Sequence, residues 1–491
     1  MTQDTATLTR DETVREAFAR EAASLLSPKG FTRDGEVIEP WLTDWRGRYT
    51  GKAFGMASPA DAQELSALVK LCAEHKVPIV PQGGNSGMVG GATPDDSGTA
   101  VLLSTRRMDK ISVDAEAREA RCGAGAILEH LHNAAEAENL RFPLSLGGKG
   151  SATVGGLVST NAGGTQVLRY GVMRSLVLGL EVVMPDGSIL DLTSPLKKDN
   201  RGFDLKQIFI GSEGTLGIVT AAVLKLSPAI AERRTVWTGL RDLPAARRLL
   251  LHCEREMGGA LEGFEVLPDS CYRTVIDYLP GAKPPLGGDH EWHALLEFAA
   301  DKEHAATLGN RVEQCLAAAM EEGLFDDAAI AANETQAEAF WQLREMIAPA
   351  ERAHARAVQH DISVPPADMP ETLSVIEGAL AQEFPDHEVR AFGHLGDGNI
   401  HLHVLAPADA ADDWDFGKAK EVSARVYRIV SDRGGSISAE HGIGQDKLST
   451  LEETHDPAAL TLMRAIKQAV DPAGLLNPGK LVPLARGEAN T

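Results

Sequence analysis

A ten-residue stretch from His394 to His403, HLGDGNIHLH, constrains the fold of this chain more than any other segment. The Asp-Gly pair at its centre is a strong signal for a two-residue β-hairpin turn. That turn predicts a register in which His394 lies directly opposite His401, and strand alternation adds Asn399 and His403 to the same face. Two imidazoles at this spacing can bind one metal ion, although an ordinary surface hairpin that happens to carry histidines is the alternative.

A third metal ligand is expected in SAEHGIG at 438–444, where Glu440 and His441 follow a strand-like stretch and precede two glycines. Two histidines and one carboxylate form a catalytic zinc set that leaves a coordination position open. Neighbouring residues of an extended chain point to opposite sides, so one of this pair is expected to bind the metal. We assign Glu440 to the metal, with His394 and His401, and His441 to proton transfer. A Glu-His pair without such a hairpin is more typical of a solvated turn.

Length and composition limit the class of protein. The 491 residues, 43% of them hydrophobic, suffice for about two or three domains with full cores. The net charge of −22 disfavours nucleic acid and anionic membranes as partners. The five cysteines are far apart, form no CxxC pair and are typical of reduced, buried thiols. No secretory signal and no run of about 18 apolar residues is visible, so we expect a cytoplasmic protein without a transmembrane segment.

The first half of the chain mixes helix and strand patterns. Ser58-Pro59 predicts the start of a helix over 60–75, and the apolar run at 77–80 predicts a strand. Asp186-Gly187 lies between two β-rich runs and predicts a hairpin.

The composition changes near residue 228, where SPAIAERR is typical of a linker and a second domain is expected to begin. Strands such as 293–299 then alternate with long Ala- and Glu-rich helices near 304–322 and 334–348. The Pro- and Gly-rich segment at 279–290 is interpreted as a loop within this domain, because strand patterns resume beyond it.

Three glycine-rich segments favour an anion-binding site in the first half of the chain. They are PQGGNSGMVGG at 81–91, LGGKGSATVGGLVSTNAGG at 146–164 and GSEGTLGIV at 211–219. Glycine permits positive φ and close approach, so successive amides can surround an anion while hydroxyl and amide side chains bind its other oxygens. A pyrophosphate is the expected ligand. No GxGxxG motif follows a strand and opens a helix, and any one of these segments alone is more typical of a structural turn.

These motifs, in this order, resemble the FAD-dependent oxidoreductases of the vanillyl-alcohol oxidase type, in the D-lactate and D-2-hydroxyglutarate dehydrogenase branch. The resemblance covers nearly the whole chain and rests on PQGGNSGMVGG, STNAGG, RYG, GSEGTLG, HLGDGNIH, EHGIG and NPGK. It implies an α+β fold with a two-part FAD-binding domain over 1–228 and an antiparallel-sheet domain for substrate and metal over 229–454. A helical carboxy-terminal segment, 455–491, is expected to return to the FAD domain.

The resemblance assigns FAD to the glycine-rich segments. It places the pyrophosphate against Gly83, Gly84, Asn85, Ser86 and Gly87, and Pro81 is also assigned to cofactor binding. It places the flavin and ribityl group against Pro143, Gly147, Ser151, Gly155, Gly156, Ser159, Asn161 and Gly164, with Ile218 and Asn477 nearby. Relatives that bind flavin covalently carry histidine where this chain has Asn85, and no cysteine lies between 143 and 164, so noncovalent FAD is expected.

The implied reaction is oxidation of a D-2-hydroxy acid to the 2-oxo acid. A divalent metal, zinc or else manganese or iron, would lower the pKa of the hydroxyl while His441 takes its proton. The hydride would pass from C2 to flavin N5. Arg344 matches the family's carboxylate-binding arginine, and its alternative is a helix-surface arginine paired with a neighbouring glutamate.

Asn399, His403 and Gln359 complete the expected substrate site. Gln359 stands where a lysine is common in hydroxyglutarate enzymes, and His403 stands where many relatives have asparagine. The loss of a cation at position 359 disfavours binding of a distal carboxylate and favours a smaller acid. The resemblance still implies 2-hydroxyglutarate first, with lactate or another D-2-hydroxy acid close behind. The expected electron acceptor is an electron-transfer flavoprotein, a quinone or a cytochrome, and the sequence leaves a homodimer open.

Two other classes of protein stay open. A zinc hydrolase would use metal-bound water with His441 as base, and its glycine loops would hold a phosphorylated substrate. Such an enzyme needs no flavin and would be colourless, whereas bound FAD is yellow. A binding protein without activity predicts no bleaching of flavin when any D-2-hydroxy acid is added without oxygen.

Overall fold

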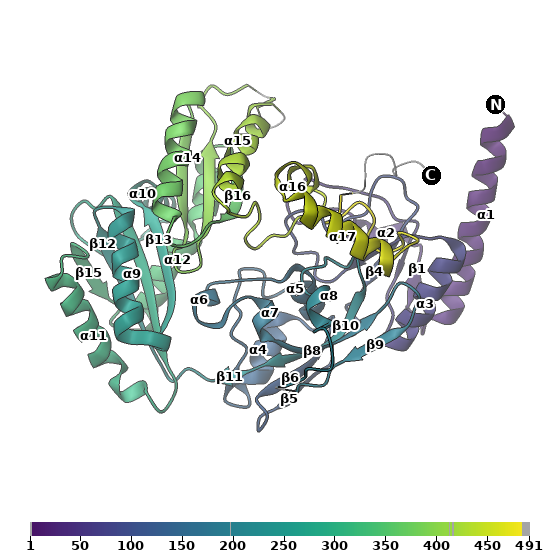
Figure 1. The fold of residues 1–491 in the computed structure, drawn as a ribbon, viewed down its shortest axis with the longest axis horizontal. Helices are drawn as coiled ribbons and strands as arrows, with labels where there is room; N and C mark the ends of the chain where they lie inside the picture. The colour runs from purple at the N-terminus through teal and green to yellow at the C-terminus, as the bar shows by residue number, and fades with distance from the viewer. Residues whose placement is uncertain (1, 197, 412, 415–416, 484–491) are drawn as a thin grey trace. The chain divides into compact units, whose positions relative to one another are not determined.

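The computed structural model describes residues 2–196, 198–411, 413–414 and 417–483, so residues 484–491 of the expected carboxy-terminal segment lie outside the described residues. The chain divides into two compact units (Figure 1). Unit 1 comprises Met1–Gly164, Val172–Ser227 and Glu440–Thr491, and unit 2 comprises Thr165–Gly171 and Pro228–Ala439. Each unit combines sheets and helices, as the predicted α+β class requires.

Unit 1 contains a four-stranded sheet whose central strands are parallel. In sheet order its strands are β1 (Phe31–Thr32), β2 (Gly55–Ala57), β4 (Val101–Ser104) and β3 (Ile79–Gln82). The predicted helix before β3 is α3 (Ala62–His75). Its N-cap is Asp61, whose side chain accepts a hydrogen bond from the N–H of Glu64 (2.9 Å), so the start predicted at Ser58-Pro59 was too early.

A five-stranded antiparallel sheet forms the rest of the strand framework of unit 1. In sheet order its strands are β5 (Ile111–Asp114), β6 (Glu119–Gly123), β10 (Ile218–Lys225), β8 (Val177–Val183) and β9 (Ile189–Leu192). The hairpin predicted at Asp186-Gly187 is confirmed, because β8 and β9 pair with Val183 opposite Ile189 and Gly187 has a φ of +78°. A short pair joins β7 (Leu140–Arg141) to β11 (Ser227–Pro228).

Helices from distant parts of the sequence complete unit 1. They are α1 (Thr2–Leu25), α2 (Gly35–Ile38), α4 (Leu128–Glu136), α5 (Val154–Thr160), α7 (Met173–Leu176), α8 (Lys206–Phe209), α16 (Leu448–Thr454) and α17 (Pro457–Val470), with the 3-10 helix η1 (Glu39–Trp41). After α17 the chain runs along β3. Ile79 donates its N–H to the carbonyl of Leu475 (2.9 Å), and Asn477 donates to the carbonyl of Ile79 (2.8 Å).

Unit 2 is built on a seven-stranded antiparallel sheet. In sheet order its strands are β15 (Asp327–Ile330), β12 (Glu232–Leu240), β14 (Trp292–Ala300), β13 (Leu261–Pro268), β17 (Glu388–His394), β18 (Asn399–Leu405) and β16 (Ala357–Ser363). The predicted strand at 293–299 is therefore confirmed, and so is the interpretation of 279–290 as a loop before it.

Helices pack on both faces of this sheet, which explains why β13 and β14 are buried at all but one residue each. One face contacts α9 (Leu243–Met257), α11 (Ala305–Glu321), α14 (Met369–Glu383) and α15 (Lys418–Asp432). The other contacts α10 (Asp269–Tyr278), α12 (Glu334–Glu345) and α13 (Ile347–His354). The remaining helical segments of unit 2 are α6 (Val167–Tyr170) and the 3-10 helix η2 (Gly258–Ala260). The helices predicted near 304–322 and 334–348 correspond to α11 and α12.

All five cysteines are buried and unpaired, as predicted. Within the described parts of the chain, no helix combines the length and the apolar character needed to cross a membrane.

Candidate active site

The stretch 394–403 contains the last residue of β17, the turn that follows it and most of the adjacent strand β18 in unit 2. The turn is longer than predicted, because His394 lies opposite Asn399 and not opposite His401. Only Gly398 in this turn has a positive φ (+80°), whereas a two-residue type I′ turn needs positive φ at both positions. The predicted register was therefore wrong by two residues. A shift of two preserves alternation, so the rings of His394 and His401 still lie close, with centroids 5.6 Å apart.

Strand β16 borders β18 and contributes a carboxylate to the same face. Asp361 lies directly opposite His401, and it accepts a hydrogen bond from Nδ2 of Asn399 (2.9 Å). The Oδ1 atom of Asn399 is buried and has no hydrogen-bond partner among the described residues. A buried oxygen without a partner is costly, so its presence here is consistent with a bound cation or ligand.

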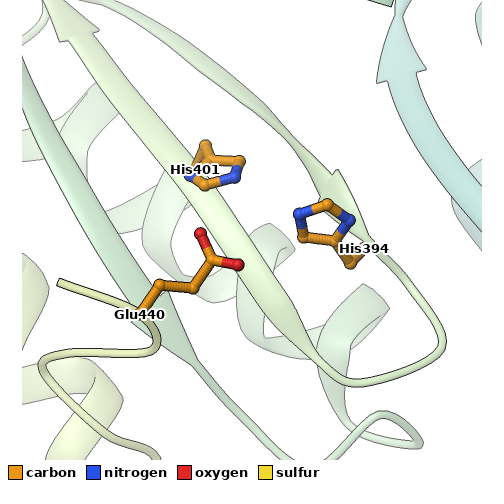
Figure 2. A group of neighbouring side chains, drawn as sticks. All are labelled: His394, His401 and Glu440. Atoms are coloured by element: carbon orange, nitrogen blue, oxygen red, sulfur yellow. The ribbon is translucent and has the colours of Figure 1, made fainter. Parts of the chain in front are cut away.

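The chain reaches this face a second time along the edge of β16. Ser363 and Ser436 exchange backbone hydrogen bonds of 3.1 and 2.7 Å, and Ala439 donates its N–H to the carbonyl of Asp361 (3.3 Å). The next residue is Glu440, whose carboxylate points toward the imidazoles of His394 and His401 (Figure 2). These three side chains can each offer one ligand atom, and the atoms lie within 4.8 Å of one another. The residues assigned to a metal from the sequence thus form one group.

His441 belongs to a second, overlapping group. Ligand atoms of Asp361, Glu440 and His441 also lie within 4.8 Å of one another. The chain bends at these residues, so the expectation that Glu440 and His441 point to opposite sides of an extended strand does not apply. Asp361 was not predicted as a member of the site. Alternation within β16 shows which of its residues share a face, but no local pattern shows that β16 lies beside β18.

His394 also contacts a buried carboxylate that the sequence did not predict. Its cross-strand neighbour on β13 is Glu265, and Nδ1 of His394 donates a hydrogen bond to that carboxylate. The second oxygen of Glu265 accepts from Nε of Arg344 (2.8 Å). Burial raises the pKa of Glu265, but His394 and Arg344 outweigh this effect and lower the pKa to about 2. Glu265 is therefore an anion between two cation-forming groups.

Arg344 lies in the last turn of α12, and its guanidinium carbon is 4.9 Å from the ring centroid of Phe392. Its ion-pair partner is a residue of the sheet, not a neighbour on its own helix. The Nη atoms of Arg344 have no hydrogen-bond partner within the part of the chain that the structure describes.

His403 and Gln359, which were also assigned to the substrate, lie opposite each other on β18 and β16. The side chain of His403 is buried, and its Nδ1 atom is hydrogen-bonded to the buried carboxylate of Glu351. Its ring meets the ring of Phe392 edge to face, with centroids 5.0 Å apart. Gln359 is half-buried.

In unit 1, a buried glutamate of the GSEGTLG segment binds the EHGIG segment. The carboxylate of Glu213 accepts hydrogen bonds from the N–H groups of Ile443 (2.7 Å) and Gly444 (2.8 Å). Burial raises the pKa of Glu213, and these two N–H groups oppose that effect. Gln445, the residue after EHGIG, donates from Nε2 to the carbonyl of Gly90 (3.0 Å) in the first glycine-rich segment.

The first two glycine-rich segments of unit 1 are in contact. A Cβ at Gly84 would lie 1.8 Å from the carbonyl oxygen of Ser151, and one at Gly83 would lie 2.2 Å from Oγ1 of Thr153. That Oγ1 is buried and has no partner in the described structure. The backbone N–H groups of residues 83–87 likewise bind no acceptor of the described chain. A run of free amides beside an unpartnered hydroxyl fits a pyrophosphate.

The remaining residues assigned to FAD also lie in unit 1. Asn85 and Asn161 both have positive φ, +53° and +51°. Asn477 donates from Nδ2 to the carbonyls of Gly91 (2.9 Å) and Glu213 (2.8 Å), and its buried Oδ1 has no partner among the described residues. Gly155, Gly156 and Ser159 lie on α5, Ile218 begins β10, Pro81 lies on β3, and Pro143, Gly147, Ser151 and Gly164 lie in the loops that flank α5.

Comparison with known families gives two matches. The model described as "FAD binding domain" matches residues 55–193, and the one described as "FAD linked oxidases, C-terminal domain" matches residues 230–481.

Curated relatives match nearly the whole chain. D-2-hydroxyglutarate dehydrogenase, mitochondrial, of Arabidopsis thaliana is 35% identical over 462 residues, which cover 94% of this chain and 80% of that protein. D-2-hydroxyglutarate dehydrogenase of Xanthomonas citri pv. viticola is 36% identical and covers 90% and 92%. The same enzyme of Stutzerimonas stutzeri is 34% identical and covers 95% and 98%.

Solved structures share the fold at low sequence identity. p-Cresol methylhydroxylase with substrate bound has a TM-score of 0.74 at 14% identity, with 96% of this chain and 97% of that chain covered. Alkyldihydroxyacetonephosphate synthase has a TM-score of 0.71 at 20% identity, with 95% and 86% covered. The expected fold of the vanillyl-alcohol oxidase type is confirmed.

Proposed function

We propose, since the chain belongs to the FAD-linked oxidases, that it oxidises a D-2-hydroxy acid to the corresponding 2-oxo acid in a metal-dependent reaction. The relatives are named D-2-hydroxyglutarate dehydrogenases, so 2-hydroxyglutarate is the first substrate to test and lactate the second. We assign FAD to unit 1, including the segment after residue 455, and the substrate and metal to unit 2 together with Glu440 and His441.

The group formed by His394, His401 and Glu440 carries the metal-dependent part of this proposal. Hydride transfer to a flavin does not itself require such a group. Two imidazoles and a carboxylate suit zinc, and also manganese or iron, and leave positions for a chelating hydroxy acid. The buried, unpartnered Oδ1 of Asn399 on the same strand face supports a ligand at this position.

Each side chain of the site has one role in the proposed reaction. When bound, FAD accepts the hydride from C2 and the divalent cation polarises the hydroxyl. His441 accepts the hydroxyl proton on its imidazole, as a general base. Arg344 pairs with the substrate carboxylate through its Nη atoms, which two parallel hydrogen bonds would orient.

The residues of unit 1 fit a dissociable FAD. The N–H groups of 83–87 and the hydroxyl of Thr153 would bind the pyrophosphate, and the Oδ1 atom of Asn477 would accept a hydrogen bond from the flavin or ribityl group. Position 85 is asparagine, and no cysteine lies between 143 and 164, so the covalent attachment seen in some relatives has no residue to use.

The proposal is tested by anaerobic addition of D- and L-2-hydroxy acids to the purified, yellow protein. We expect D-2-hydroxyglutarate to bleach the flavin absorbance and the L-enantiomer to leave it unchanged. Treatment with a chelator should slow bleaching, and added zinc or manganese should restore it. Unchanged bleaching after complete metal removal would exclude the metal-dependent step, and a colourless protein that hydrolyses esters would favour the hydrolase alternative.

A further inference from the structure

One buried carboxylate contacts two residues of the proposed site at once. Glu265 lies on β13, and its side chain is 1% exposed. One of its oxygens accepts from Nδ1 of His394, and the other accepts from Nε of Arg344 at 2.8 Å. All three residues belong to unit 2.

The contact with His394 determines which ring nitrogen can bind a cation. An imidazole that donates from Nδ1 carries its lone pair on Nε2, the nitrogen that can bind a cation. The hydrogen bond also fixes the orientation of the ring, and a carboxylate partner makes Nε2 a stronger metal ligand. The edge-to-face neighbour His401, whose ring plane is inclined by 74°, adds a second imidazole at 5.6 Å.

The contact with Arg344 determines which edge of the guanidinium stays available. Because Glu265 binds Nε, both Nη atoms remain for a second carboxylate. The ring of Phe392, 4.9 Å from the guanidinium carbon, supports its plane. A lysine at this position could not present two parallel donors in this way.

We propose that Glu265 is a positioning residue that holds the metal ligand His394 and the arginine Arg344 in one fixed arrangement. The inference rests on the proposed function, and it adds that metal affinity and binding of the acid depend on the same carboxylate. Loss of Glu265 therefore weakens the binding of the metal and of the acid, because Glu265 contacts the two residues that hold them.

The test is Glu265→Gln, which keeps the shape of the side chain but can accept only one of the two hydrogen bonds. Zinc affinity of the metal-free protein is measured by competition with a chromogenic chelator. We expect zinc to bind roughly 10- to 100-fold more weakly than to the wild type, the usual effect of removing such a partner. The KM for D-2-hydroxyglutarate should rise as well, while the bound flavin spectrum stays unchanged.

Glu297→Gln is the matched control. Glu297 is also buried in this sheet, on β14, and also binds an arginine, Arg233, together with Nε1 of Trp341 on α12 (2.8 Å). Strand β13 lies between β14 and β17, the strand that ends at His394, so the Glu297→Gln variant should bind zinc like the wild type. Equal zinc affinity of Glu265→Gln and the wild type overturns the inference. If the wild type binds no zinc, both the inference and the metal-dependent function are wrong. If the wild type binds zinc but D-2-hydroxyglutarate bleaches the flavin equally well without it, only the metal-dependent function is wrong.

A measurement on the wild type covers the case in which Glu265→Gln does not fold. In zinc-loaded protein with nitrogen-15-labelled histidine, the His394 signal, assigned from its absence in His394→Gln, should show a proton on Nδ1 and none on Nε2. A proton on Nε2 would overturn the inference.

Discussion

Adjacent residues of the EHGIG segment have different tasks in the proposed reaction. Glu440 completes the group with His394 and His401, whereas His441 lies with Asp361 and Glu440 in the overlapping group. A carboxylate beside an imidazole stabilises the cation that forms when the imidazole accepts a proton. Asp361 is therefore placed to support His441 as the base.

Replacing His441 by alanine should separate cofactor binding from chemistry. We expect His441→Ala to retain FAD but to reduce it roughly 100-fold more slowly or worse, because the proton acceptor is missing. Anaerobic stopped-flow absorbance with D-2-hydroxyglutarate measures this rate. His455→Ala, at an exposed histidine just after α16, is the control and should react like the wild type. An unaltered rate in His441→Ala would place the base elsewhere.

Single residues show how far sequence reasoning reaches. Alternation grouped His394, His401 and Asn399 on one face correctly even though the turn was longer than predicted, because the error was an even number of residues. Glu265 and Asp361 could not be found in this way. They come from strands whose neighbours are set by the order of the whole sheet, and Glu265 is 129 residues away from His394.

At the scale of the elements, the loop after β3 can pack against the segment before α5 only because its glycines have no side chains. At Gly84 the nearest atom to an added Cβ is the backbone oxygen of Ser151, at 1.8 Å, and backbone cannot move aside as a flexible side chain can. Sequence composition predicted that this loop would bind an anion, but not that it packs directly on the segment before α5.

Gly84→Ala should therefore lose its flavin. We expect the purified variant to contain much less FAD than the wild type, because the two glycine-rich segments must separate. The ratio of flavin to protein absorbance measures this. Gly150→Ala is the matched control, since an added Cβ there meets nothing closer than a glutamate oxygen at 3.8 Å. A Gly84→Ala variant that keeps full FAD content would contradict the proposed cradle.

A second prediction at this scale concerns the segment that carries the proposed base. Glu213→Gln leaves one of the N–H groups of Ile443 and Gly444 without its acceptor, which costs about 1–3 kcal/mol for a buried group. Amides of the EHGIG segment should then exchange with deuterium roughly 10-fold faster or more, as measured by mass spectrometry. Glu181→Gln makes the same change at a carboxylate that accepts from Thr220 (2.8 Å), and it should leave deuterium exchange in the EHGIG segment unchanged. Identical exchange in Glu213→Gln would argue against an anchoring role.

For the molecule as a whole, a buried histidine links stability to pH. Burial lowers the pKa of His293 to about 4, although Asp269 partly opposes the shift. Its Nδ1 atom accepts a hydrogen bond from Nε1 of the buried Trp237 (3.1 Å), which only the neutral ring can do. The folded protein thus binds this proton less readily than the unfolded chain.

Stability should consequently fall as the pH is lowered from 6.5 to about 4, because the unfolded chain takes up the proton first. The shift corresponds to at most about 3 kcal/mol. Urea unfolding followed by tryptophan fluorescence across this range measures it. His293→Gln should lose less stability than the wild type, and His304→Gln, at an exposed histidine, should behave like the wild type. Equal pH dependence in all three proteins would remove His293 as the cause.

The order in which the segments of the two units are translated affects how the protein folds during synthesis. The chain leaves unit 1 after residue 227 and returns at residue 440, and β3 pairs only then with the stretch around Leu476. A ribosome therefore delivers all of unit 2 before the closing segment of unit 1 emerges, although most of unit 1 is translated earlier. During that interval β3 is an edge strand without its later hydrogen-bond partners at Leu475 and Asn477, and such an unpaired edge is a site of aggregation in a partly made chain.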